Sequence, residues 1–251
     1  MNVITPIQET DLDFDNGSFD SSAFAAQALS SWQTLAAVID HTLLKPDATS
    51  DQVENLCDEA IRYRFACAMV NPVWVPAAVS VLSGTGIPVG AVIGFPLGAS
   101  LVSTLRQEAD AVICLGAREV DMVIPIGQLK SGNHHAVHHA IHAVADVAHR
   151  HGALLKVILE TALLTVEEKL RGAEIAIQAG ADFLKTSTGF ASGGATPADV
   201  ALLRGVAGAR SGVKASGGIR TLADVRALLE SGATRIGASA SVAIVRELGA
   251  E

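Results

Sequence analysis

The sequence has few aromatic residues, few cysteines and no long apolar run, and each shortage excludes a class of protein. Aromatic residues make up only 4% of the 251 residues, so no platform for stacking nucleic-acid bases is evident. Charges, glycine or proline interrupt every apolar run before it reaches the ~18 residues of a membrane helix. The cysteines (Cys57, Cys67 and Cys114) match no zinc-binding spacing, and we expect reduced, buried thiols rather than disulfides.

The net charge limits the classes of partner, and the N-terminal residues indicate the cellular compartment. A net charge of −8 argues against nucleic acid and anionic membranes as partners. Backbone N–H groups can still bind a phosphate inside an acidic protein. The first residues lack the basic start and the apolar core of a secretory signal, so we expect a cytoplasmic location.

The chain divides at about residue 30. We expect residues 1–30 to form an acidic extension, disordered or loosely docked, with a helical stretch over 22–37, and residues 31–251 to form one domain. Eight short apolar or β-branched runs in this domain have the length of buried strands. They cover residues 38–42, 65–70, 88–93, 119–124, 155–160, 183–186, 213–216 and 235–237.

Helical segments alternate with these runs and carry recurring end signals. Capping residues open three of them, at Thr165, Thr196 and Thr221. A Gly-Ala pair closes four of the helical segments before a strand, and a glycine suits the left-handed residue that ends a helix. These glycines are Gly116, Gly152, Gly180 and Gly232. Eight strand–helix units predict a TIM (β/α)8 barrel, and a doubly wound open sheet is the alternative.

The repeated glycines also indicate which polar residues point into the barrel. Asp121 lies five residues after Gly116, and Lys185 lies five residues after Gly180. Because side chains alternate along a strand, matched positions point to the same side. We therefore expect Asp121 and Lys185 to meet inside the barrel, with Lys214 in a neighbouring strand. The offset of Lys156 is four, which favours a supporting or structural role.

A lysine inside a barrel strand admits two interpretations. Burying an unpaired ammonium group is unfavourable, so the amine either pairs or loses its proton. A structural Lys–Asp ion pair is the first possibility. The second is an amine that a low-polarity site and a neighbouring cation make nucleophilic.

Glycine-bearing loops follow the last strands, where TIM barrels commonly bind phosphate. Gly217 and Gly218 follow the seventh strand, Ser239 follows the eighth, and Gly189 lies just beyond Lys185. Small residues let backbone N–H groups approach an anion. Tight turns without a ligand are the alternative.

A group of histidines could instead hold a metal. Several have the i, i+4 spacing that can bind zinc, but no nearby carboxylate completes the set, so a solvated helix face is favoured over a metal site. They are His134, His135, His138, His139 and His142. We expect no metal and no cofactor.

Seven stretches of the chain, taken together, form a recognisable pattern: Ile39–Leu44, Val92–Gly98, Glu119–Val123, Lys156–Thr161, Ala181–Phe190, Lys214–Arg220 and Arg235–Ser239. On these stretches the chain resembles the deoxyribose-phosphate aldolase family of Schiff-base aldolases with a TIM-barrel fold. The resemblance implies reversible cleavage of 2-deoxy-D-ribose 5-phosphate to acetaldehyde and D-glyceraldehyde 3-phosphate.

The same resemblance implies roles for individual residues. Lys185 would form the Schiff base, Asp121 and Lys214 would relay protons, and the phosphate would lie on the loops of Gly189, Gly217, Gly218 and Ser239. A sugar phosphate and acetaldehyde would be the only partners required, and a homo-oligomer is compatible with this reading. The chain departs from many relatives at Met69, where they carry cysteine, and it lacks the C-terminal tyrosine of some relatives.

Two other functions remain open at this point. Another Schiff-base lyase, such as a transaldolase-like barrel, would use the same lysine on a three-carbon donor. A non-catalytic sugar-phosphate sensor would keep the glycine loops but would not need Asp121, Lys185 and Lys214 together.

Overall fold

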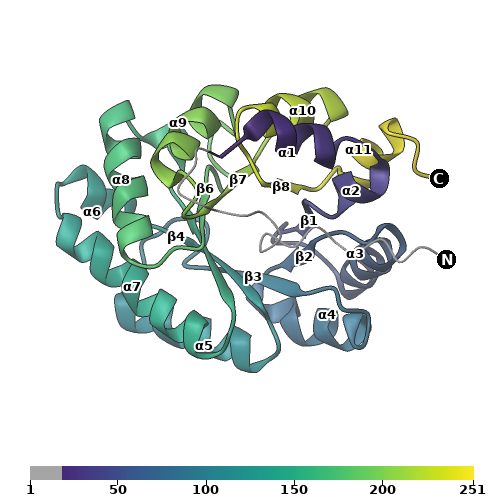
Figure 1. Cartoon of the computed structure of the whole chain (residues 1–251). Coiled ribbons are helices and arrows are strands. Elements are labelled where there is room, and N and C mark those ends of the chain that lie inside the picture. Colours follow the sequence, from purple (N-terminus) through teal and green to yellow (C-terminus); the bar gives the residue numbers. More distant parts are fainter. Residues whose placement is uncertain (1–18) are drawn as a thin grey trace.

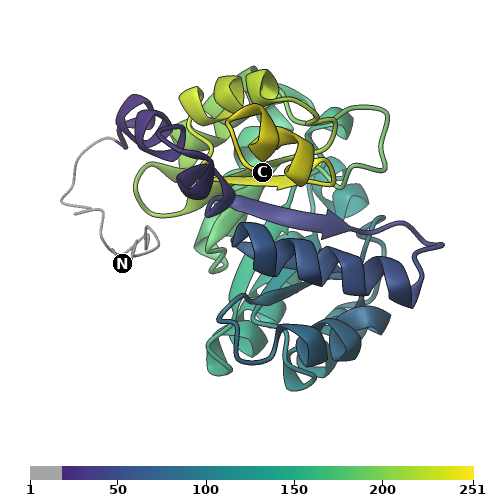
Figure 2. The same ribbon diagram turned by 90° about the vertical axis from the view of Figure 1, so that its right-hand side faces the viewer.

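A computed structural model describes residues 19–251, which form a closed barrel of parallel strands surrounded by helices (Figures 1 and 2). Each strand pairs with the next along the chain, and β8 pairs with β1 through Ile39 and Ile236. The predicted TIM barrel is confirmed, and the closing pair excludes the open sheet. The strands are β1 (Ile39–Leu43), β2 (Cys67–Val70), β3 (Val89–Ile93), β4 (Glu119–Val123), β5 (Leu154–Ile158), β6 (Phe183–Lys185), β7 (Gly212–Ser216) and β8 (Arg235–Ala238).

Helices form the outer layer and connect successive strands. They are α1 (Ser21–Ala28), α2 (Trp32–Ala36), α3 (Ser50–Tyr63), α4 (Val75–Leu82), α5 (Val102–Cys114), α6 (Ile126–Lys130), α7 (His134–Arg150), α8 (Val166–Gln178), α9 (Pro197–Ala207), α10 (Leu222–Glu230) and α11 (Ser241–Glu247). Two short 3-10 helices cover Pro72–Trp74 and Thr161–Leu163. Within residues 19–251, no helix is long and apolar enough to span a membrane.

The predicted helix ends are confirmed. Thr165 and Thr221 each form a reciprocal capping box at the start of α8 and α10, and Thr196 caps α9. The four predicted glycines each stand one residue beyond a helix C-cap, with φ between 68° and 113°. A side chain would disfavour this backbone conformation, so glycine allows the chain to turn sharply from helix into strand.

Two helices, α1 and α2, precede the first strand of the barrel. The predicted helical stretch over 22–37 is two helices, because Ser31 leaves helical geometry to cap α2 in a capping box with Thr34. Helix α1 buries Phe24 and Ala28 and packs beside α10 (Figures 1 and 2). Residues 1–18 of the predicted extension lie outside the described residues, so the division at residue 30 stays a prediction.

The barrel strands separate an apolar exterior from a charged interior. Strand residues such as Val120, Met122 and Leu184 belong to the large apolar core beneath the helices. The residues that alternate with them point inward, and several are ionisable yet fully buried, including Asp121 and Lys156. The fold therefore brings charged side chains together where little water can solvate them.

Candidate active site

The centre of the barrel holds a connected network of charged side chains. Lys185 Nζ donates to Asp121 Oδ2 at 2.7 Å, and Lys214 Nζ donates to the same oxygen at 2.8 Å. Lys156 Nζ donates to the other oxygen, Oδ1, at 2.9 Å. The structure thus brings together the three predicted catalytic residues and adds Lys156, which the glycine spacing had set apart.

Asp121 is held as a carboxylate by this arrangement. Burial alone would raise its pKa, but the neighbouring charges of Lys156, Lys185 and Lys214 lower the pKa well below its usual range. Asp40 on β1 behaves in the same way. It accepts hydrogen bonds from Lys214 and, at 2.8 Å, from Arg235, and these cations keep its pKa low despite burial.

Lys185 differs in its proton affinity from Lys156, another buried lysine of the network. Burial lowers the pKa of Lys185 to about 8, Lys214 adds to the lowering, and Asp121 opposes it. About one tenth of the Lys185 amines are then neutral at pH 7. Burial also acts on Lys156, but the attraction of Asp121, Glu119 and Asp40 raises its pKa well above the usual value. Lys156 is therefore an ammonium ion, and Lys185 can supply a free amine.

The register of the strands separates the two lysines in depth. Asp121, Lys156, Lys185 and Lys214 are each the third residue of their strand. Lys185 pairs with Lys214, but Lys156 pairs with Phe183, two residues before Lys185. Lys185 and Lys214 thus lie one layer nearer the carboxyl ends of the strands than Lys156 does. They line a cavity there, and Lys156 does not.

Among the residues that the structure describes, the cations of this network outnumber its carboxylates by one when every group is ionised. Lys156, Lys185, Lys214 and Arg235 contact a set of three carboxylates, formed by Asp40, Glu119 and Asp121. Loss of one proton from Lys185 makes the numbers equal. Although Cys67 also lies beside Asp40 and Glu119, the cations already occupy these carboxylates, so the geometry does not favour a metal ion there.

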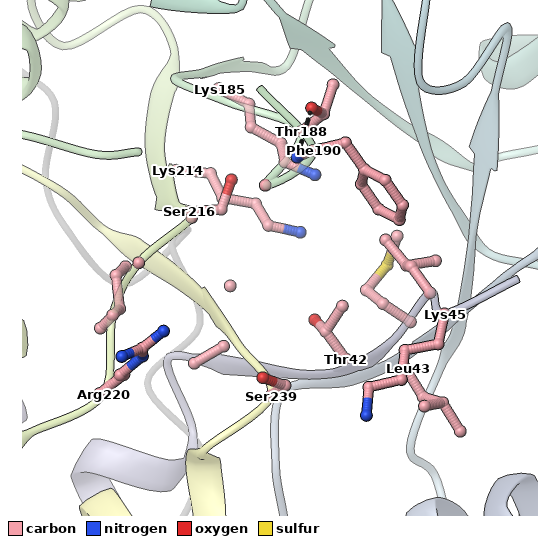
Figure 3. A pocket seen from close by; sticks show the side chains of 18 residues that line it. Thr42, Leu43, Lys45, Lys185, Thr188, Phe190, Lys214, Ser216, Arg220 and Ser239 are labelled. Carbon is pink, nitrogen blue, oxygen red and sulfur yellow. Dashed lines mark hydrogen bonds between the residues drawn. The ribbon is translucent and has the colours of Figure 1, made fainter. Parts of the chain in front are cut away.

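A cavity of about 300 Å³ opens at the carboxyl ends of the strands, where TIM barrels place their active sites. Lys185 and Lys214 reach it from one side, with Thr42 and Ser239 across from them (Figure 3). The four residues predicted to bind phosphate all line the cavity: Gly189, Gly217, Gly218 and Ser239. The exposed side chains of Lys45 and Arg220 stand at its rim.

Glycine is required in these loops because backbone approaches backbone. Gly217 has φ 90°, and a Cβ there would lie 3.1 Å from the Cα of Gly194. Gly218 has φ 78°, but its missing side chain would point into open space. At the eighth strand, a Cβ on Gly237 would lie 2.9 Å from Lys214 Cε, so this glycine makes room for the lysine.

Sequence reasoning missed the residue that holds the loop after β6. Glu160 is buried in left-handed geometry with φ 58°, and its Oε2 accepts from both the backbone N–H (3.2 Å) and the hydroxyl of Thr188. The Thr188 hydroxyl oxygen in turn accepts from the N–H of Phe190 at 3.0 Å. A non-glycine residue at positive φ is an unusual backbone feature and would have been the signal, but it is visible only in the structure.

Two further predictions concern the histidines and the cysteines. Four of the five predicted histidines are exposed on α7 and His138 is half-buried, which confirms a solvated helix face; the exposed ones are His134, His135, His139 and His142. All three cysteines are free thiols, but only Cys57 and Cys67 are buried. The expectation of buried thiols is wrong for Cys114, because this residue ends α5 on the side that faces solvent.

Comparison with known proteins places this geometry in a family. Residues 34–247 match the family described as DeoC/LacD family aldolase. A deoxyribose-phosphate aldolase of Geobacillus sp. (strain WCH70) is 54% identical over 211 residues, 84% of this chain and 94% of that protein. One of Listeria monocytogenes is 55% identical over 212 residues, 84% of this chain and 95% of that protein.

A solved structure supports the same assignment. The tetrameric deoxyribose phosphate aldolase of Aeropyrum pernix superposes with a TM-score of 0.84 at 35% identity, covering 91% of this chain and 96% of that one. The similarity therefore extends over the whole barrel in both sequence and fold.

Proposed function

Because this chain is an aldolase of the DeoC/LacD family, and therefore a lyase, we propose that it reversibly cleaves 2-deoxy-D-ribose 5-phosphate through a Schiff base on Lys185. The products are acetaldehyde and D-glyceraldehyde 3-phosphate. One observation carries the proposal. Lys185 combines a pKa lowered to about 8 with a place on the wall of a cavity that the glycine loops also line.

The reaction begins with the free amine of Lys185. Its lone pair attacks C1 of the open-chain sugar, and loss of water leaves a protonated imine. Deprotonation of the C3 hydroxyl group then allows the C2–C3 bond to break. The bonding electron pair moves into the imine to give an enamine, and C3 leaves as the aldehyde of glyceraldehyde 3-phosphate.

Asp121 and Lys214 are suited to move the protons of these steps. Asp121 Oδ2 accepts hydrogen bonds from both Lys185 and Lys214, so a proton lost at one group can be taken up by the next. Protonation of the enamine at C2 gives the imine of acetaldehyde, and addition of water returns the free Lys185. The water released on imine formation is consumed here.

The phosphate is assigned to the loops of Gly189, Gly217, Gly218 and Ser239. These residues line the same cavity as Lys185, so a phosphate bound there would hold C1 near the amine. The positive charges of Lys45 and Arg220 at the rim favour an anion approaching the cavity. Since the imine is itself an electron sink, we expect EDTA to leave the turnover rate unchanged.

Two measurements test the proposal. The protein is first assayed with 2-deoxy-D-ribose 5-phosphate for release of acetaldehyde. It is then treated with acetaldehyde and borohydride, which should fix a two-carbon adduct on Lys185. An adduct mapped to Lys156 or Lys214 contradicts the assignment of the amine.

The same assay separates the alternatives. Imine trapping without cleavage of the deoxy sugar phosphate would indicate a different donor, as in a transaldolase-like enzyme. Binding of the sugar phosphate without trapping or turnover would indicate a sensor.

A further inference from the structure

Three potential metal ligands meet on the outer surface of the barrel, away from the cavity. They are Asp110, Cys114 and His151, all exposed, and one ligand atom of each lies within 4.8 Å of the other two. Asp110 and Cys114 are one turn apart on α5, and His151 is the C-cap residue of α7. Helices α5 and α7 pack side by side, so the group joins two elements (Figure 1).

The spacing of these atoms suits a tetrahedral metal ion. His151 Nε2 lies 3.4 Å from Asp110 Oδ1, longer than the ~2.9 Å of a usual N–H···O hydrogen bond. Two ligand atoms at ~2.0–2.1 Å from a zinc ion in tetrahedral geometry are ~3.3 Å apart. The pair therefore already has the separation that two zinc ligands require.

The donor types and charges point to the same class of ion. Thiolate sulfur, imidazole nitrogen and carboxylate oxygen are all zinc ligands, and a mixed set with a soft sulfur is unsuited to magnesium or calcium. On binding, the Cys114 thiol would release its proton to solvent. The thiolate and the Asp110 carboxylate would then neutralise a divalent cation.

We propose that Asp110, Cys114 and His151 form a surface site for a zinc-class divalent cation, with water as the fourth ligand. The site links the ends of α5 and α7. Both helices end where their following strands, β4 and β5, begin, which is the end of the barrel opposite the cavity. The ion thus acts on the stability of the barrel and not on the aldolase chemistry, and the inference does not depend on the proposed function.

Cobalt(II) is the probe that tests the sulfur ligand directly. Protein dialysed against a chelator is titrated with Co²⁺, and a thiolate-to-cobalt charge-transfer band should grow to one equivalent and disappear when Zn²⁺ is added. Cys114→Ser should abolish the band. His151→Ala should weaken binding by at least ~100-fold, since even loss of an outer partner weakens metal sites 10- to 100-fold.

The histidines on α7 supply the matched control. His135 and His139 are exposed and spaced i, i+4, so they could bind a metal by themselves. The double variant His135→Ala/His139→Ala should keep the charge-transfer band at one equivalent. Absence of the band in the wild-type protein, or its persistence in Cys114→Ser, would overturn the proposal.

Thermal melting gives a second readout. Zn²⁺ at 100 times its Kd should shift the folding equilibrium of the wild-type protein ~100-fold toward the native state. Cys114→Ser should melt like the metal-free wild type, with or without Zn²⁺, and should keep full aldolase activity. An equal Zn²⁺-dependent shift in both proteins would also overturn the proposal.

Discussion

Replacing Lys214 by methionine should raise the pKa of Lys185 and stop imine formation at neutral pH. Methionine keeps a similar length and removes the positive charge. The carboxylates that Lys214 contacts keep other partners, since Asp40 retains Arg235 and Asp121 retains Lys156. The variant should therefore fold, and its effect should be electrostatic.

The size of the effect follows from the shared oxygen. Lys185 and Lys214 donate to Asp121 Oδ2 at 2.7 and 2.8 Å, so their nitrogen atoms are ~5 Å apart. Two charges ~5 Å apart at an effective dielectric of ~20 repel by ~3.3 kcal/mol, or ~2.4 pKa units. The pKa of Lys185, about 8 in the native protein, should then approach the ~10.4 of an unperturbed lysine. The neutral fraction at pH 7 should fall on the order of a hundredfold.

The assay is single-turnover trapping of the acetaldehyde imine across a range of pH. The wild-type protein should show an apparent pKa near 8 for imine formation. The variant should show little trapping at pH 7 and a partial return at pH 9–10, where ~4–30% of an unperturbed lysine is neutral. Steady-state turnover can stay low at every pH if Lys214 also relays protons, which is why trapping is the informative measurement.

Lys156→Met is the matched control. This change removes another buried lysine that is bonded to Asp121. Lys156 contacts the other carboxylate oxygen, Oδ1, and lowers the pKa of Lys185 less than Lys214 does. The pKa of Lys185 should rise less in this variant than in Lys214→Met. An unchanged or lowered pKa in Lys214→Met would refute the electrostatic reasoning.

Three other variants test other parts of the site. Gly218→Glu places a negative charge in the open space beside Gly218, and it should reduce kcat/KM for deoxyribose 5-phosphate at least ~10-fold more than for deoxyribose. Gly218→Ala is the control, because it strains the same backbone without adding a charge. Equal losses on both sugars would count against the phosphate site. Glu160→Ala removes the acceptor of both hydrogen bonds that Thr188 donates. The variant should raise KM for the sugar phosphate ~10-fold or more, and it should still trap acetaldehyde on Lys185. If substrate affinity and trapping were lost together, Glu160 would not act through the loop. Lys185→Met should stabilise the protein at pH 7, because the amine is protonated there in the unfolded chain but its pKa is lowered from 10.5 to about 8 in the folded one. That shift corresponds to ~3 kcal/mol below pH 8, and the gain should vanish as the pH rises toward 10.5, which melting curves at pH 7 and 10 would show.

The sequence was sufficient for the architecture because its signals are local. Each predicted strand overlaps an observed one, since short β-branched runs and capping residues act within a few residues of themselves. The spacing from glycine worked for Asp121 and Lys185, whose strands both begin three residues after the glycine. The offset of Lys156 is four because β5 begins two residues after Gly152, so Lys156 is likewise the third residue of its strand.

What the sequence could not show depends on pairing between distant segments. The depth of Lys156 relative to Lys185 follows from the register of β5 with β6, and no local pattern encodes this register. The partnership of Asp40 with Lys214 joins residues 174 positions apart. The hydrogen bond from Thr188 to Glu160 likewise joins two loops. It depends on a positive φ angle at Glu160, which a glutamate rarely adopts.

The pairing register of β5 with β6, in which Lys156 lies opposite Phe183, limits where insertions and deletions can occur in evolution. Insertions in a helix or in an outer loop leave Asp121 and Lys185 in place, because the strands between them keep their pairing. One residue inserted before Lys185 within β6 would turn that side chain outward to the helices and bring an apolar neighbour into the cavity. Family members that keep the chemistry should therefore show alignment gaps in the connections and almost none within β4, β5, β6 and β7.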